Sequence, residues 1–299
     1  MKKLFKILGI IVLLTAAGIG IYLFNIYTDV RDTMEDIFVP IVTEDVREEE
    51  LDLSSGEPFS VLLLGIDSDG PNDPGRSDSM MVVTVNPALG STYILSIQRD
   101  TRVDIPGRGW DKINHAYAFG GAELSINTVQ DFLNIPIDYF VGIDMDGFEV
   151  LIDTVGGVTV DNTTLSFYQS GYYFPLGEQH LSGSQALQFT RMRLYDPRGD
   201  FGRMERQRLV LEALARRLAT FALTRHQAIL DTISSYIATN ITIGDIMTLS
   251  THHLGALGEI HLEDLGGTGQ IINGIWYLNV SEEARLAAQN RLREHLELD

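Results

Sequence analysis

Short apolar runs separated by turn signals dominate the first half of the chain and predict buried β-strands. The run at 59–66 is continuously apolar and β-prone, as expected of a strand covered on both faces. Residues 80–85 and 92–97 have the same character, and the segment between them contains the Gly and Pro residues typical of turns. Shorter runs at 139–143 and 158–160 complete the predicted strands.

Apolar residues recur at helical spacing in much of the remaining chain. Leu211, Leu214 and Leu218 mark one face of a helix predicted at 204–223. Further helices are predicted at 122–133, 148–154, 182–190, 227–238, 243–257 and from 281 onward, with a strand pair near 260–276. Strands and helices mix without strict βαβ alternation, which predicts an α/β (α+β mixed) fold with a central mixed β-sheet flanked by helices.

The N-terminal segment has the length and charge pattern of a single transmembrane helix. Residues 7–28 carry no charged side chain and are long enough, as a helix, to cross a bilayer core of about 30 Å. Three lysines precede this run and acidic residues predominate after it, so the positive-inside rule places the N-terminus in the cytoplasm. A cleaved signal peptide, with Ala16 and Gly18 near the processing site, is the alternative. Either form exports the rest of the protein.

These features predict three regions along the chain. Residues 1–28 form the cytoplasmic start and the transmembrane helix, residues 29–58 an acidic extracellular stalk, and residues 59–299 one globular domain. No composition shift or internal repeat marks a further boundary within the globular region. The protein is therefore expected in the cell membrane, with its domain outside.

Composition excludes several classes of function. Aspartate and glutamate outnumber lysine and arginine 41 to 22, and the formal net charge of −19 argues against a nucleic-acid partner. The chain has no cysteine, which excludes disulfides, thiolate catalysis and cysteine-ligated zinc. Arginine accounts for 18 of the 22 basic residues. Its planar guanidinium can grip phosphate or carboxylate through two parallel hydrogen bonds, which lysine cannot do.

Nine arginines fall within 191–225, and the first of them predict an anion site. Arg191 and Arg193 are two residues apart and point to one face if the backbone there is extended. Arg203 and Gln207 lie on one face of the helix that follows. The loop between the two groups contains the sequence Gly-Asp-Phe-Gly, whose glycines and aspartate are typical of a well-defined turn. A helix N-terminus beside such a cluster adds positive potential for a phosphate.

A solvated helix face is the alternative for the later arginines. Arginines on a surface helix commonly pair with acidic residues three or four positions away, and Glu205 and Glu212 offer such partners. This interpretation is preferred for Arg208, Arg216, Arg217 and Arg225. Arg206 stays open between the two interpretations, because it shares the helix face of Arg203.

Two acidic–basic clusters directly follow predicted strands, where loops of α/β sheets commonly carry ligands. Asp67 and Asp78 lie at the ends of one loop, and two carboxylates can share a divalent cation such as Mg²⁺. Arg76, in the same loop, can hold the anion that this cation bridges. The second cluster contains Arg99 and Asp100. Taken alone, either cluster is also compatible with turn chemistry or a surface ion pair.

Motifs for several other chemistries are missing from the sequence. There is no Walker loop, no GxGxxG and no GxSxG, which excludes the nucleotide-binding and serine-hydrolase functions that depend on them. The histidines show no metal-ligand spacing such as HExxH. We interpret the following as structural: His115, His180, His226, His252, His253 and His261.

Together, these segments resemble the LytR–CpsA–Psr family, whose members attach polymers to the cell wall. The matching stretches are Val61–Asp67 (VLLLGID), Arg76–Val85 (RSDSMMVVTV), Ile94–Gly107 (ILSIQRDTRVDIPG), Lys112–Gly121 (KINHAYAFGG), Gly157–Val160 (GVTV), Leu181–Arg193 (LSGSQALQFTRMR) and Gly199–Gln207 (GDFGRMERQ). They follow the order and the spacing of the family over residues 59–223. The chain departs at Gln98, where the family usually has proline.

The resemblance implies a phosphotransferase at the outer leaflet, with 59–299 as an extracellular catalytic domain. Such an enzyme passes the glycan phosphate of a polyprenyl-pyrophosphate-linked glycan to a peptidoglycan hydroxyl and releases polyprenyl phosphate. By position, the resemblance assigns Mg²⁺ (or Mn²⁺) to Asp67 and Asp78, and pyrophosphate binding to Arg76, Arg99, Arg191, Arg193, Arg203 and Gln207. It implies that Asp200 orients the arginines and that Arg99 and Asp100 act at the reacting groups, with Asp100 orienting or deprotonating the incoming hydroxyl. Phosphoryl transfer mainly requires such positioning and charge neutralisation.

Two other functions would use the same residues. A lipid- or polyanion-binding module would hold the polyprenyl donor and regulate without turnover. A pyrophosphatase would use water in place of the sugar hydroxyl. All three functions require that the predicted arginines face one cavity, and loss of transfer in an Arg99→Ala variant with an intact fold would favour the transferase.

Overall fold

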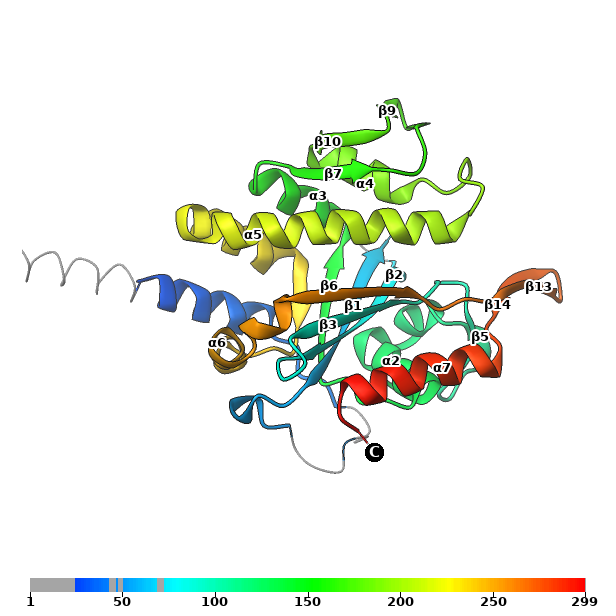
Figure 1. Cartoon of the computed structure of the whole chain (residues 1–299), viewed down its shortest axis with the longest axis horizontal. Coiled ribbons are helices and arrows are strands. Elements are labelled where there is room, and N and C mark those ends of the chain that lie inside the picture. Colours follow the sequence, from blue (N-terminus) through cyan, green and yellow to red (C-terminus); the bar gives the residue numbers. More distant parts are fainter. Residues whose placement is uncertain (1–24, 43–46, 48–50, 69–72, 299) are drawn as a thin grey trace, which may run out of the picture.

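The computed structural model describes residues 25–42, 47, 51–68 and 73–298. Residues 25–37 form a helix that leads toward the domain (Figure 1). The lysines and most of the apolar run that predict a transmembrane helix fall on residues 1–24 and lie outside the described residues. Within the described part of the chain, no helix combines the length and the apolar character needed to cross a bilayer.

A six-stranded mixed β-sheet forms the centre of the domain (Figure 1). Its strands, in spatial order, are β11 (Ile237–Thr239), β6 (Tyr139–Asp144), β1 (Phe59–Asp67), β2 (Arg76–Asn86), β3 (Ser91–Ser96) and β12 (Glu259–Asp264). β1 runs parallel to β6 and β3 runs parallel to β12, whereas the other neighbours are antiparallel. The predicted fold with a central mixed sheet is therefore confirmed.

Helices cover both faces of this sheet, but they cover them differently. On one face α2 (His115–Leu133) and α7 (Glu282–His295) enclose a buried core with sheet residues such as Leu62 and Leu64. Over the other face lie α3 (Met145–Thr154), α4 (Gly183–Arg191) and α5 (Asp200–Tyr236), whose buried side chains form a separate core of their own (Figure 1). An apolar pocket lies between this second face and its helices.

α5 is one continuous helix of 37 residues, where the sequence predicts two helices at 204–223 and 227–238. No Gly or Pro occurs at 224–226, so nothing in the backbone chemistry ends the helix there. The helix begins at Asp200, directly after the loop that follows α4. This early start places its first turn beside the ends of β1 and β2.

β12 corrects the predicted strand pair near 260–276. It joins the main sheet beside β3 instead of pairing with the strand that follows it. The hairpin in this region is formed by β13 (Thr268–Ile272) and β14 (Ile275–Asn279). Its two turn residues, Asn273 and Gly274, have φ angles of 51° and 81°, as a tight hairpin turn requires.

Shorter elements complete the domain. They are η1 (Leu53–Ser55), β4 (Arg102–Ile105), β5 (Gly109–Lys112), β7 (Val158–Asn162), β8 (Phe167–Gln169), β9 (Tyr172–Phe174), β10 (Gly177–Leu181), α6 (Ile243–His252) and η2 (Leu254–Leu257). β4 pairs with β5, β7 with β10, and β8 with β9. The β4–β5 hairpin leads from β3 into α2, so it lies beside the loop that follows β3.

The acidic stretch 29–58 contacts the domain at its described positions. Arg47 Nε lies 2.6 Å from Asp138 Oδ1, and Leu53 is buried. Met34 and Ile37 of the preceding helix are also buried. Parts of the predicted stalk therefore pack against the domain, while its boundaries and its side of the membrane stay predictions.

Candidate active site

A β-bulge at the end of the β1–β2 pair sets the position of Asp78. Gly65 lies opposite Ser79 and Ile66 lies opposite Ser77, so Asp78 is the extra residue in β2. A bulge bends its strand locally and redirects the side chain of the extra residue. Here the carboxylate of Asp78 meets the loop that follows β3.

The loop after β3 brings cations to two carboxylates. Arg99 Nη1 forms a short ion pair with Asp78 Oδ2, and Asn114 Nδ2 donates to Asp78 Oδ1 at 3.1 Å. Lys112 Nζ donates to Asp100 Oδ1 at 2.6 Å. The other oxygen of Asp100 lies 3.7 Å from Arg99 Nε. Asp100 is therefore held between two cations.

Arg191 and Arg193 approach from the end of α4. A capping box fixes the start of this helix, and Arg191 is its last residue. Met192 is extended and its side chain is buried, so the arginines on either side of it point away from the core. The predicted extended backbone is thus correct for Met192 and wrong for Arg191. Arg191 Nη2 lies 2.9 Å from Asp67 Oδ1.

Arg203, in the first turn of α5, reaches the same place. Its Nη2 lies 2.9 Å from Asp200 Oδ1 and 3.3 Å from the backbone oxygen of Asp78. Burial raises the pKa of Asp200, although the charges of Arg203 and Arg99 counteract this effect. Burial lowers the pKa of Arg203, and the charges of Arg99 and Arg193 lower it further. Guanidinium groups from three elements repel one another here, and a bound anion would relieve that repulsion.

Two guanidinium N–H groups at this point lack an acceptor. Arg99 Nε and Arg203 Nε are shielded from solvent and make no hydrogen bond to the described residues. Buried donors without partners cost free energy, and native proteins generally pair them. These two groups therefore mark positions where oxygen atoms of a ligand would complete the site.

Two adjoining cavities contain the predicted site residues. The polar cavity is lined by Arg76, Asp100, Lys112, Asn114 and His115, among others. The arginine cavity is lined by Arg191, Arg193, Arg203 and Gln207, among others. Asp67, Asp78 and Arg99 line both, so the two cavities meet at these residues. Asp200 lines neither cavity and contacts Arg203 from the side. Four of the five predicted arginines therefore face one cavity, and Arg76 lines only the adjoining one. The roles of these residues in a reaction stay predictions.

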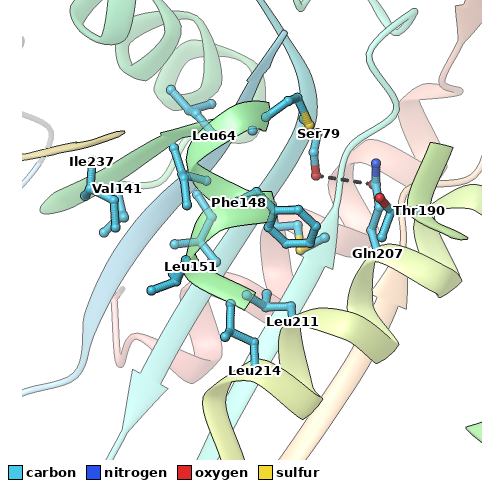
Figure 2. Close-up of a pocket in the computed structure, with 15 residues that line it drawn as sticks. Leu64, Ser79, Val141, Phe148, Leu151, Thr190, Gln207, Leu211, Leu214 and Ile237 are labelled. Atoms are coloured by element: carbon cyan, nitrogen blue, oxygen red, sulfur yellow. Dashed lines mark hydrogen bonds between the residues drawn. The ribbon is translucent and has the colours of Figure 1, made fainter. Parts of the chain in front are cut away.

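An apolar pocket adjoins the arginine cavity on the second face of the sheet (Figure 2). Sheet residues such as Leu63 and Met81 form one side of it, and side chains of α3 and α5 form the other. Most of its lining side chains are apolar, as is typical of sites that bind a hydrophobic ligand. Met145, Thr190 and Gln207 line both this pocket and the arginine cavity. A continuous path therefore leads from an apolar environment to a cationic one.

Gln207 stands at the boundary between these two environments. Ser79 Oγ donates to Gln207 Oε1 at 3.2 Å (Figure 2). With its oxygen engaged, the amide nitrogen is the end of Gln207 that can donate to a ligand oxygen.

Three residues of the site had no role predicted from the sequence. Lys112 and Asn114 hold the carboxylates of the polar cavity, and Thr190 lines the boundary of the apolar pocket. The sequence contained one indication that Lys112 is functional, because it is the only lysine beyond residue 6. Nothing in the sequence indicated a role for Thr190, since a threonine in an amphipathic helix is ordinary.

The later arginines divide into three kinds. Arg206 belongs to the interior, where its side chain is 1% exposed and Nη1 lies 2.7 Å from Asp196 Oδ2. Arg216 pairs with Glu212 at 2.6 Å on the surface, as predicted. Arg208 is half-buried and pairs with a carboxylate at the end of β12, so its predicted solvated position is wrong.

Asp67 and Asp78 fit a divalent cation that arrives together with a phosphate. Both line the point where the cavities meet, and each is also held by an arginine. Mg²⁺ usually takes one or two carboxylates and completes its shell with phosphate oxygens and water. Within the described ranges, no group of three or more His, Cys, Asp or Glu residues forms a dedicated metal cage. The donor set therefore suits Mg²⁺ or Mn²⁺ shared with a ligand.

Comparison with known proteins identifies the family. The model of the LytR_cpsA_psr family matches residues 26–294. The chain belongs to the LytR_cpsA_psr family. A curated relative from Bacillus cereus, named polyisoprenyl-teichoic acid–peptidoglycan teichoic acid transferase TagU, is 44% identical over 302 residues, which cover 99% of this chain and 98% of the relative.

Solved structures of related proteins share the fold. The crystal structure of B. subtilis TagU aligns with a TM-score of 0.66 at 39% identity, covering 81% of this chain and 98% of that chain. A structure of TagT bound to LIIa-WTA aligns with a TM-score of 0.74 at 28% identity, covering 87% of this chain and 100% of that chain. The family predicted from the motifs is therefore confirmed, and the LytR_cpsA_psr match extends beyond the motif region to α7.

Proposed function

We propose that this member of the LytR_cpsA_psr family transfers a teichoic-acid-type glycan phosphate from a polyprenyl-pyrophosphate carrier to a peptidoglycan hydroxyl. The proposal is carried by one observation. Arginines that are far apart in the chain converge on a cavity that adjoins an apolar pocket. A diphosphate with a hydrocarbon tail requires these two environments side by side. The name of the Bacillus cereus relative supports the polymer class and the acceptor.

Binding of the donor would divide between the two environments. The hydrocarbon of the carrier would enter the apolar pocket, where burial contributes about 25 cal/mol per Å² of apolar surface. The diphosphate would lie among Arg99, Arg191, Arg193 and Arg203, with Arg76 at the far side and Gln207 at the boundary. Guanidinium groups hold phosphate oxygens through charge-assisted, often bidentate hydrogen bonds. The buried N–H groups without partners would then be satisfied.

Asp67 and Asp78 would hold Mg²⁺ or Mn²⁺. The bound cation would neutralise charge on the diphosphate oxygens. Arg191 and Arg99 already hold the two carboxylates in place, so little reorganisation would be needed when the donor arrives. Asp200, buried beside Arg203, would orient that guanidinium.

The transfer itself exchanges one P–O bond for another. The acceptor hydroxyl oxygen attacks the phosphorus that carries the glycan, and the bond from this phosphorus to the bridging oxygen breaks. Polyprenyl phosphate leaves with the electron pair, and the hydroxyl proton passes to a base. Asp100 lines the polar cavity and is held by Lys112, so its carboxylate is placed to accept the hydrogen bond that orients the hydroxyl. No nucleotide is required, because cleavage of the diphosphate supplies the driving force.

The donor and the acceptor both imply a location outside the cell. We propose a single-pass protein of the cell membrane, with the span at 7–28, a cytoplasmic N-terminus and an extracellular catalytic domain. Protease treatment of intact protoplasts tests this topology. Digestion of the domain supports it, and full protection of the domain would contradict it.

A reconstitution assay separates transfer from its two alternatives. The full chain in detergent would be incubated with a polyprenyl-pyrophosphate-linked glycan and peptidoglycan oligosaccharides, with Mg²⁺ or with a chelator. Mass spectrometry of a phosphodiester-linked product supports the proposal. Release of free glycan phosphate would indicate a pyrophosphatase, and donor binding without turnover would indicate a regulatory module. Arg99→Ala should abolish product, and the exposed Arg216→Ala variant is the matched control.

A further inference from the structure

A histidine that is paired with an aspartate lines the polar cavity beside the proposed reaction site. His115 is the first residue of α2, and Asp111 lies in β5, four positions earlier. His115 Nδ1 lies 2.9 Å from Asp111 Oδ2. His115 itself lines the polar cavity together with Arg76, Asp100 and Lys112. The sequence pattern predicted a structural role for this histidine, but its position adjoins the chemistry.

The pair leaves one nitrogen of the ring available. A carboxylate at Nδ1 favours the tautomer that carries its proton there, so Nε2 keeps its lone pair. Nε2 of His115 makes no hydrogen bond to any described residue. The ring also contacts Phe119 edge to face, with centroids 5.9 Å apart, which restrains it from the side. A base oriented in this way by a carboxylate is the usual arrangement for activating a hydroxyl.

Three carboxylates of the cavity are paired with cations. Arg191 holds Asp67, Arg99 holds Asp78, and Lys112 holds Asp100. A carboxylate that is paired with a guanidinium or an ammonium is a weaker base, because the cation stabilises its ionised form. Nε2 of His115 is free of such a partner. Of these four groups, the histidine is therefore the one placed to accept a proton.

We infer that His115 is the general base for the acceptor hydroxyl and that Asp111 is its positioning residue. The inference rests on the proposed transfer function. As the hydroxyl oxygen forms its bond to the glycan phosphorus, its proton moves to His115 Nε2, and polyprenyl phosphate leaves with the electrons of the broken P–O bond. The proton returns to solvent after the product departs. Asp111 stabilises the imidazolium formed during this step.

Charged groups surround the histidine on several sides. Those that share its cavity are Asp67, Asp73, Arg76, Asp78, Arg99, Asp100 and Lys112. Arg108 stacks on Phe119 at 5.1 Å, next to the ring. Because these groups can also affect the rate as pH changes, the contribution of His115 is obtained by comparing the pH profiles of variants. Donor binding is measured separately at each pH.

The test is the rate of phosphodiester formation by the full chain, measured across pH. His115→Gln should lower kcat by about 10²- to 10⁴-fold at neutral pH and remove the loss of rate toward acid, with the KM for the donor nearly unchanged. Imidazole added to His115→Ala should restore part of the rate, which a merely structural role would not allow. Asp111→Asn should lower kcat less than His115→Gln and shift the acid limb. His261→Gln is the matched control, because His261 pairs with Glu259 at 3.7 Å in β12 and does not line the cavity.

The outcomes distinguish failure of the His115 inference from failure of the proposed transfer function. If wild-type protein forms no phosphodiester, the proposed function fails. If wild-type protein forms it and His115→Gln keeps both kcat and the acid limb within twofold, only the inference is overturned. Loss of activity in His115→Ala with no imidazole rescue, together with an unchanged acid limb in His115→Gln, would also overturn it.

Discussion

Arg203 and Arg206 lie three residues apart on α5 and are both buried, yet their surroundings differ. Arg206 donates from all three nitrogens, to Phe189 O at 3.1 Å, to Asp196 Oδ2 at 2.7 Å and to Met192 O at 2.5 Å. Arg203 leaves its Nε without an acceptor at the edge of a cavity. A buried arginine with every donor satisfied supports the fold, whereas Arg203, which lines a cavity and keeps one unpaired donor, fits the proposed ligand-binding role.

The aspartates paired with these arginines differ in the same sense. Burial favours the neutral form of Asp196, but hydrogen bonds from Arg206 and Arg198 outweigh burial and lower its pKa. Burial dominates at Asp200 and raises its pKa. The Asp196 pair is thus a complete structural unit, whereas burial disfavours the ionised form of Asp200.

Removal of the satisfied arginine should have the largest effect. Arg206→Met leaves the Asp196 carboxylate buried, and breaking a buried ion pair in this way costs about 3–5 kcal/mol in the free energy of unfolding. Urea denaturation followed by circular dichroism measures the loss. Adding Asp196→Asn to Arg206→Met should recover part of it, because no buried charge then stays unpaired. Equal stability of Arg206→Met and wild type would show that the Arg206–Asp196 pair does not support the fold.

The same substitution at Arg203, one helical turn earlier, should affect activity more than stability. Arg203→Met removes a donor to the diphosphate, and we expect transfer to fall about 10²- to 10³-fold, as when one preorganised donor is lost from a reaction site. The free energy of unfolding should fall less than in Arg206→Met, because the charges of Arg99 and Arg193 still act on Asp200 and the cost of burying the Arg203 guanidinium is removed. Product formation and urea denaturation are measured on the same sample. A variant that unfolds as readily as Arg206→Met would show that Arg203 is structural.

The pH dependence of stability should have opposite signs at the two aspartates. The folded-state pKa of Asp196 lies below its unfolded value, so its contribution is present above that value and is lost as pH falls through the folded pKa. The folded-state pKa of Asp200 lies above its unfolded value, so its ionised form costs stability, and the cost disappears as pH falls. Urea midpoints between pH 3 and 7 for Asp196→Asn and Asp200→Asn test these signs. Parallel pH curves for both variants and wild type would contradict the assignment.

An exposed ion pair should give the smallest effect. Arg216 is 79% exposed and pairs with Glu212 one helical turn away. Exposed pairs contribute less than about 1 kcal/mol, and Arg216→Ala should change the free energy of unfolding by under about 0.5 kcal/mol. Transfer should stay at the wild-type rate. A larger loss of stability would mean that this ion pair supports the fold, and a lower transfer rate would mean that this part of α5 takes part in binding.

Elements with strong periodicity could be predicted from the sequence, and their boundaries could not. The apolar run at 59–66 became β1, and the serine before α4 caps that helix as expected. The predicted break in α5 was wrong, because no residue there disfavours helix and packing against α3 and β7 extends it. β12 was paired wrongly, since pairing partners depend on the whole sheet and not on the strand itself.

The candidate site shows the same division. The motifs named Asp67, Asp78, Arg99, Arg191, Arg193 and Arg203, and the structure brings them around two joined cavities. The apolar pocket beside them was not visible in the sequence, because its residues have the periodicity of ordinary core. His115 was interpreted as structural for a similar reason: its partner Asp111 and its cavity become evident only in three dimensions.

By itself the sequence determined the family, the central mixed sheet and the residue types available for phosphate, because local periodicity and motif spacing are written along the chain. It could not decide which of several buried arginines face a ligand. That decision belongs to the tertiary structure, since it depends on whether each guanidinium finds acceptors from distant segments. Arg206 finds all of them in α4 and the loop that follows, and Arg203, one turn away, does not.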